Sequence, residues 1–174
     1  MLHGRQPLRD DLLSRFPELE GIADTLQRAV NLIAASLRSG GTLYACGNGG
    51  SAADAEHIVG ELGKSFLRDR GLVESERVHF QRVCGGDGRE LGARLQRGLR
   101  AVTLTGHPSL STAIGNDIGG DIVFAQQLYV LGRPGDVLLG ISTSGNARNV
   151  ILAAQVAHAS NLQVVSLTGK EGGA

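Results

Sequence analysis

The sequence predicts an α/β fold in which helices cover a doubly wound parallel sheet. Short apolar runs alternate along the chain with helical segments, and glycine-rich turns follow two of these runs. Strands that are apolar throughout are typical of parallel sheets buried on both faces, and a parallel connection needs a crossover that is usually a helix. The four predicted strands are residues 42–46, 101–105, 136–141 and 162–167.

The predicted helices fill the intervals between these strands. Apolar side chains recur every three or four residues over 19–38, which predicts an amphipathic helix ended by Gly40 and Gly41. A shorter helix around 10–16 is expected to stop at Pro17. After the first strand, we expect Ser51 to cap a helix that reaches about Leu62. Two further helices are predicted over 121–131 and 146–160.

Composition and charge exclude several classes of protein. The 174 residues hold 17 basic and 17 acidic side chains, so there is no electrostatic reason to expect nucleic acid or an anionic membrane as a partner. No apolar run approaches the roughly 18 residues of a spanning helix, and residues 1–9 lack the apolar core of a signal peptide. Two cysteines form no disulfide framework. We therefore expect one cytoplasmic domain over residues 1–174, with N-terminal helices at about 9–38.

Residues 67–100 do not fit the strand and helix alternation. This Arg-rich segment holds eight arginines and five acidic residues, and part of it, 90–99, looks helical. A solvated insertion or a subunit contact is the favoured interpretation, and an anion site is the alternative.

Two corners between a strand and a helix carry the strongest functional signal. They are Cys46-Gly47-Asn48-Gly49-Gly50-Ser51 and Ile141-Ser142-Thr143-Ser144-Gly145-Asn146. Glycine lets the backbone approach a ligand closely, and a helix N-terminus offers N–H groups to an anion. Both corners fall at the carboxyl ends of strands, where open parallel sheets bind ligands. A tight turn with a capping serine remains the alternative for either corner alone.

The chemistry of these corners suits a small phosphorylated metabolite. Neither contains a Walker loop or a dinucleotide fingerprint, which disfavours ATP and NAD. The donors that the two corners do offer to a phosphate group are backbone N–H groups and hydroxyl groups.

The helix after the first corner carries a second signal. His57 and Glu61 are four residues apart and share one helical face, and Asp54 and Lys64 lie close to the same stripe. A glutamate one turn beyond a phosphate loop is well placed as a general base, and a His/Glu pair can supply two metal ligands. The alternative is an exposed face with a chance pair.

A third candidate is Asn116-Asp117, which follows the second strand. These two residues could line the same crevice, or one of them could be an N-cap.

Taken together, these motifs closely resemble phosphoheptose isomerases of the sugar isomerase (SIS) domain family. The resemblance runs from about Leu19 to the last residue, except for 67–100. The motifs are the first corner, His57 with Glu61, Gly115-Asn116-Asp117, residues 132–146, and Leu167-Thr168-Gly169-Lys170.

The resemblance implies a flavodoxin-like sheet and a homotetramer with active sites near subunit interfaces. It implies interconversion of sedoheptulose 7-phosphate and D-glycero-D-manno-heptose 7-phosphate, with Glu61 as the catalytic base and zinc on His57 and Glu61. The residues it implies as contacts of the sugar phosphate are Asn48, Gly49, Gly50, Asn116, Asp117, Ser142, Thr143 and Ser144; Ser51, in the first corner, joins our list of substrate-binding residues.

Three departures from the family pattern stand out. Ala147 replaces a family serine, and the Arg-rich segment is longer than in typical members. The family also continues beyond position 174 with a strand and a helix that supplies a Gln and a His as further metal ligands, so we expect this chain to be truncated.

Two other functions stay open at this point. One is a non-catalytic SIS protein that binds a phosphosugar, such as the type that associates with the DnaA initiator. The other is an isomerase of another phosphosugar. Non-catalytic members lose the glutamate, so the presence of Glu61 favours an enzyme.

Overall fold

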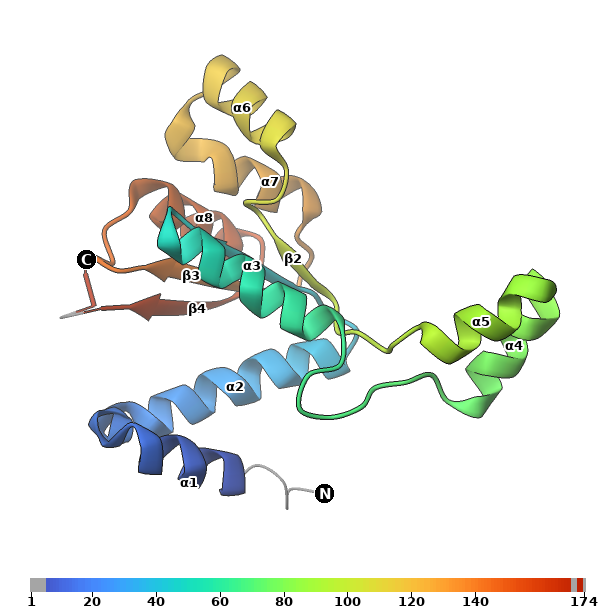
Figure 1. Ribbon diagram of the computed structural model, residues 1–174. Helices are drawn as coiled ribbons and strands as arrows, with labels where there is room; N and C mark the ends of the chain where they lie inside the picture. Colours follow the sequence, from blue (N-terminus) through green and yellow to red (C-terminus); the bar gives the residue numbers. More distant parts are fainter. Residues whose placement is uncertain (1–5, 170–171, 174) are drawn as a thin grey trace. The chain divides into compact units, whose positions relative to one another are not determined.

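The computed structural model describes residues 6–169 and 172–173 and divides the chain into two compact units, 1–35 and 36–174 (Figure 1). The prediction that 1–174 form a single domain stays a prediction.

The first unit consists of helical segments. These are α1 (Gln6–Arg15), the 3₁₀ turn η1 (Pro17–Ile22) and the greater part of α2 (Ala23–Arg38). The guanidinium of Arg9 pairs with the carboxylate of Asp24 at 2.8 Å and joins α1 to α2. Both predicted helices are present, but the second opens with η1, because Pro17 fits the first turn of a helix, where no N–H is needed.

The second unit contains a four-stranded parallel sheet in the order β2-β1-β3-β4. The strands are β1 (Leu43–Gly47), β2 (Ala101–Thr103), β3 (Val137–Ser142) and β4 (Gln163–Thr168). The chain leaves β1 toward one edge and then returns to build the other, so the predicted doubly wound sheet is confirmed. In this strand order, ligands bind where the direction of winding reverses, between β1 and β3.

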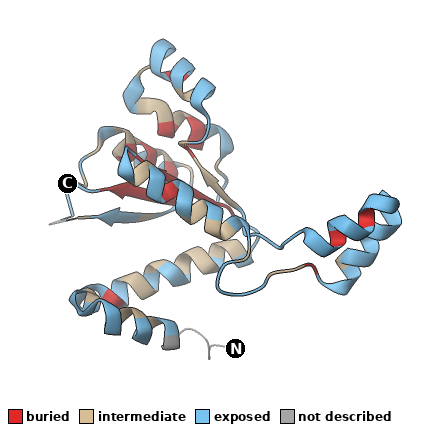
Figure 2. Cartoon of the chain, viewed as in Figure 1, coloured by how far each residue is buried: buried red, intermediate tan, exposed pale blue. Residues whose placement is uncertain are grey.

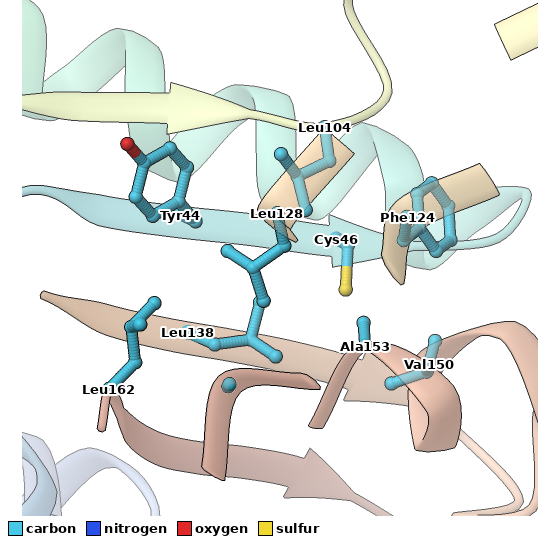
Figure 3. Packing of buried hydrophobic residues seen from close by; sticks show 10 residues of the cluster. Tyr44, Cys46, Leu104, Phe124, Leu128, Leu138, Val150, Ala153 and Leu162 are labelled. Atoms are coloured by element: carbon cyan, nitrogen blue, oxygen red, sulfur yellow. The ribbon is translucent and has the colours of Figure 1, made fainter. Parts of the chain in front are cut away.

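Helices pack on both faces of β1 and β3 (Figure 1). On one face lies α3 (Gly50–Gly63). On the other, α7 (Val123–Leu131) and α8 (Arg148–Ala159) enclose the main apolar core with side chains of β1 and β3 (Figure 3). Tyr44, Cys46, Leu128 and Leu138 are among its buried members.

The chain between β2 and α7 contains a helix that the sequence did not predict. This is α6 (Pro108–Asp117), which opens on a proline and is followed by the 3₁₀ turn η2 (Gly120–Ile122). The predicted helix 121–131 therefore consists of η2 and α7.

The Arg-rich segment forms a helical hairpin of α4 (Glu74–Cys84) and α5 (Gly86–Arg94). The helix predicted over 90–99 is wrong in its bounds, because Leu95 is extended and Gln96 pairs with Gly71 in an isolated antiparallel bridge. Most side chains of the hairpin are exposed (Figure 2).

The edge strand β4 differs from its neighbours in burial. All residues of β1 and β3 are buried, whereas five of the six residues of β4 are exposed (Figure 2). The prediction that both faces of the sheet are covered therefore holds for β1 and β3 and is wrong for β4. Among the described helices, none has the length and apolar character needed to cross a lipid bilayer.

Candidate functional site

The two glycine-containing corners lie side by side at one edge of the sheet. The parallel register pairs Gly47, the last residue of β1, with Ile141 of β3. The chain therefore leaves both strands at the same level, on the two sides of the point where the winding reverses. The structure brings together the two corners that the sequence singled out separately.

Glycine is required twice in the first corner. A Cβ atom on Gly47 would lie 2.7–2.8 Å from atoms of Ser51, which no real side chain tolerates. Gly49 precedes α3 with φ of 55°, in the left-handed region. Ser51 is wrong as the predicted cap, because Gly49 is the N-cap and α3 begins at Gly50, so Ser51 already lies within the first turn.

The second corner is a hydrogen-bonded turn. Gly145 N donates to Ser142 O at 3.0 Å, and Asn146 N donates to Ser144 Oγ at 3.1 Å. Ser142 is buried, while Thr143 and Ser144 are exposed. The helix predicted from Asn146 begins two residues later, because residues 142–146 are engaged in this turn.

The first residues of α8 add groups that the sequence reading missed. The N-cap residue Ala147 makes no side-chain hydrogen bond, and Val150 N already donates to Ala147 O, so the N–H groups of the first two residues of α8 are the ones that remain for a ligand. Arg148 is the first residue of this helix and is exposed. A positively charged residue thus follows the second corner, which we described from its hydroxyl and N–H donors alone. The position of Arg148 directly after the loop was the sequence signal that could have revealed it.

Asn149 joins the two corners. Its amide and that of Asn48 form a reciprocal pair, in which each Nδ2 donates to the other Oδ1 at 2.9 Å. The Oδ1 atom of Asn149 also accepts from Val150 N at 3.0 Å. No local spacing relates residues 48 and 149, so only the folded chain reveals this contact.

Glu61 lies in the last turn of α3, and its carboxylate already has a partner. Lys64 Nζ lies 3.0 Å from both Oε1 and Oε2 of Glu61. His57 lies one turn earlier on the same helix and is exposed. The helix thus carries both residues on one face, as the sequence predicts.

Asn116 and Asp117 are the last two residues of α6. Asn116 Nδ2 donates to Asp117 Oδ1 at 2.8 Å. The alternative that either is an N-cap is wrong, because Gly119 precedes η2 and Ile122 precedes α7. Their place in the crevice with the two corners stays a prediction.

The described residues do not complete the zinc site that the resemblance implies. Within 6–169 and 172–173, no three His, Cys, Asp or Glu side chains gather closely enough to hold a metal ion. The carboxylate of Glu61, one of the two expected ligands, is paired with an ammonium group. We therefore assign no step of the reaction to a metal.

Cys46 lies within β1 and opens the first corner, but it is unsuited to chemistry there. Burial raises the pKa of its thiol to about 12. A thiol that stays protonated is neither a nucleophile nor a metal ligand, so Cys46 is a residue of the buried core.

Comparison with known proteins agrees with the motifs. The SIS domain family model matches residues 10–85 and 92–169. A phosphoheptose isomerase of Thiobacillus denitrificans is 40% identical over 160 residues, which cover 92% of this chain and 68% of that protein. A phosphoheptose isomerase of Neisseria gonorrhoeae is 44% identical over 146 residues, which are 84% of this chain and 61% of the relative.

Solved structures show the same similarity. The phosphoheptose isomerase of Neisseria gonorrhoeae superposes with a TM-score of 0.63 at 36% identity, over 95% of this chain and 77% of that one. The enzyme of Francisella tularensis gives a TM-score of 0.73 at 28% identity, over 97% and 75%. In the matching motif at 167–170, Lys170 lies outside the described residues.

Proposed function

The chain belongs to the SIS domain family, among its phosphoheptose isomerases, and from this premise we propose that it interconverts sedoheptulose 7-phosphate and D-glycero-D-manno-heptose 7-phosphate. The observation that carries the proposal is the pairing of Gly47 with Ile141. It puts a glycine loop and a hydroxyl-rich loop beside each other at the reversal point of the sheet, with Glu61 on the helix that leaves the first loop.

The phosphate group of the substrate binds at the second corner in this proposal. The hydroxyls of Ser142, Thr143 and Ser144 and the uncapped N-terminus of α8 offer donors to the phosphate oxygens. Arg148 adds a positive charge. The amide and backbone of Asn48, with Gly49, Gly50 and Ser51, bind the sugar end, and Asn116 and Asp117 complete the pocket.

Glu61 transfers the proton. Starting from the ketose, its carboxylate removes a proton from C1 while the C2 oxygen gains one, which gives a cis-enediol. The carboxylic acid then returns the proton to C2 as the C1 oxygen loses its own, which gives the aldose. No electrons leave or enter the substrate, so the reaction needs no redox cofactor.

The test compares the purified protein with Glu61→Gln on sedoheptulose 7-phosphate, with the heptose phosphate product measured directly. We expect Glu61→Gln to lower kcat by about 100-fold or more, since the glutamine cannot accept a proton. Glu56→Gln is the matched control on the same helix, because its carboxylate accepts a hydrogen bond from Thr105 instead, and it should keep normal kcat.

Three outcomes separate the candidate functions. Absence of turnover by the wild type would overturn the isomerase, and binding of the phosphosugar without turnover would favour a non-catalytic SIS protein. Turnover of a different phosphosugar alone would identify another isomerase. A separate outcome concerns the residue alone. Equal turnover by the wild type and Glu61→Gln would show that Glu61 does not transfer the proton.

Two further properties belong to the same proposal. We propose a homotetramer, as the resemblance implies, and large apolar side chains exposed on this chain support an assembly. A cytoplasmic location stays a prediction.

A further inference from the structure

The ion pair between Lys64 and Glu61 involves the residue to which the proposed reaction assigns the proton transfer. Lys64 Nζ lies 3.0 Å from each carboxylate oxygen of Glu61, so one ammonium group bridges both. The side chain of Glu61 is 27% exposed and that of Lys64 58% exposed. The side chain of Glu61 is therefore partly shielded by the protein, and the lysine that bridges its carboxylate is the more exposed partner.

The backbone around this pair is fixed by the Arg-rich segment. The guanidinium of Arg70 donates to Glu61 O at 2.7 Å and to Leu62 O at 3.0 Å, and so satisfies two carbonyls at the end of α3. Leu99 N donates to Leu62 O as well. Immediately after Lys64, Ser65 N donates to Gln96 Oε1 at 2.7 Å.

These contacts give residues 67–100 a role beyond a solvated insertion. The segments that enter and leave the hairpin both bind the turn that carries Glu61 and Lys64, the first through Arg70 and the second through Gln96 and Leu99. Lys64 itself is the extended residue that ends α3, with φ of −139° and ψ of 177°. Its ammonium is thereby directed back onto the last turn of the helix.

We propose that Lys64 is a positioning residue. Its ammonium group holds the Glu61 carboxylate and takes the place that the family resemblance gives to a zinc ion. This inference rests on the proposed function. A zinc ion bound about 2.0–2.2 Å from either oxygen would lie within about 5 Å of the ammonium, and the two cations would repel each other. A fixed cation and a zinc ion therefore compete for the same carboxylate.

The kinetic test compares Lys64→Met with Lys64→Arg on sedoheptulose 7-phosphate. Methionine keeps the unbranched side chain, one atom shorter, but loses its charge, so the carboxylate is released and kcat should fall about 10- to 100-fold, with little change in KM. Arginine keeps a cation that can bridge both oxygens and should retain most of kcat. A pair that merely stabilised the fold would leave the kcat of the folded Lys64→Met enzyme unchanged.

The matched control is Arg94→Met, which removes an exposed ion pair to Glu90 within α5. It should leave both kinetic constants unchanged. Wild-type kcat in Lys64→Met, or equal losses in Lys64→Met and Lys64→Arg, would overturn the proposal.

A second test reads metal binding without any activity. Equilibrium dialysis against zinc chloride should show binding at least about tenfold tighter in Lys64→Met than in the wild type, because the carboxylate is no longer paired. Adding His57→Ala should abolish this gain. Tight, stoichiometric zinc in the wild type that Lys64→Met leaves unchanged would overturn the inference. This result stands even if the wild type turns over no phosphosugar, so the inference and the proposed function fail separately.

Discussion

At the scale of single residues, Asn149 is the side chain that ties the two ligand corners together. Its reciprocal amide bonds to Asn48 fix the orientation of a residue that we assign to substrate binding. The Oδ1 atom of Asn149 also accepts a hydrogen bond from Val150 N near the start of α8. Asn149 thus orders both walls of the proposed pocket without itself being part of either corner motif.

Replacement of Asn149 by alanine should therefore weaken substrate binding more than turnover. We expect KM to rise about fivefold, or about 1 kcal/mol, because Asn48 loses both amide bonds that orient it, while kcat changes less. Steady-state kinetics with sedoheptulose 7-phosphate measures both constants. Gln155→Ala removes an exposed amide from the same helix and should leave KM unchanged. An unaltered KM in Asn149→Ala would show that Asn48 needs no support.

Cys46 predicts a dependence of stability on alkaline pH. Its thiol has a pKa of about 12 in the folded protein because burial disfavours the thiolate, against an ordinary 9.0. Below pH 9 both states hold the proton and the thiol has no effect. As the pH rises from 9 toward 12, only the unfolded state loses its proton, so the free energy of unfolding falls by about 1.4 kcal/mol per pH unit.

Urea unfolding of the wild type and Cys46→Ala between about pH 8 and pH 11 measures this effect. The alanine variant is less stable throughout, but its stability should decline less steeply above pH 9. The pKa of Tyr44 is also raised, by burial first and then by Asp136, and it contributes equally in both proteins. Parallel pH profiles would contradict the assignment to Cys46.

At the scale of elements, the turn from β1 into α3 depends on the absence of a side chain at Gly47. A Cβ atom there would meet backbone and Cβ atoms of Ser51 at 2.7–2.8 Å. Gly47→Ala should therefore destabilise the protein by about 1–3 kcal/mol, since the helix must shift to relieve the contact. The expected loss is measured as a lower midpoint of urea unfolding.

Gly60→Ala is the matched control within α3. An added Cβ at Gly60 meets no atom within 4 Å, so alanine should stabilise the helix by up to about 1 kcal/mol. If Gly47→Ala were as stable as Gly60→Ala, the inference that the corner has no room for a side chain at Gly47 would be wrong.

The elements also show what sequence patterns can and cannot locate. The four strands lie within one or two residues of their predicted bounds, because continuous apolar runs report burial directly. Helix α6 escaped notice because its apolar side chains are few, and only Ile114 is buried. The predicted helix at 90–99 ends at Arg94, because Gln96 forms its bridge with Gly71, a residue remote in sequence.

At the scale of the whole molecule, exposed apolar side chains predict self-association. Phe66, Leu67 and Tyr129 are each 68–74% exposed, although burying such apolar groups would lower the free energy of the protein. We expect light scattering coupled to size-exclusion chromatography to give four times the chain mass at micromolar concentration. A monomer at all concentrations would contradict the proposed homotetramer.

The sequence by itself determined the parallel α/β architecture, the two corners and the pair His57 and Glu61, because apolar runs, glycine turns and helical spacing are local signals. Only the tertiary structure decided which side chains meet across the chain. Asn149 reaches Asn48, and Arg70 binds the carbonyls of the turn that carries Glu61. Lys64 stood near the predicted stripe, but its bond to both oxygens of Glu61 depends on how α3 ends. The physical reason is that these contacts depend on strand register and on the path of the Arg-rich segment, which no spacing between neighbouring residues encodes.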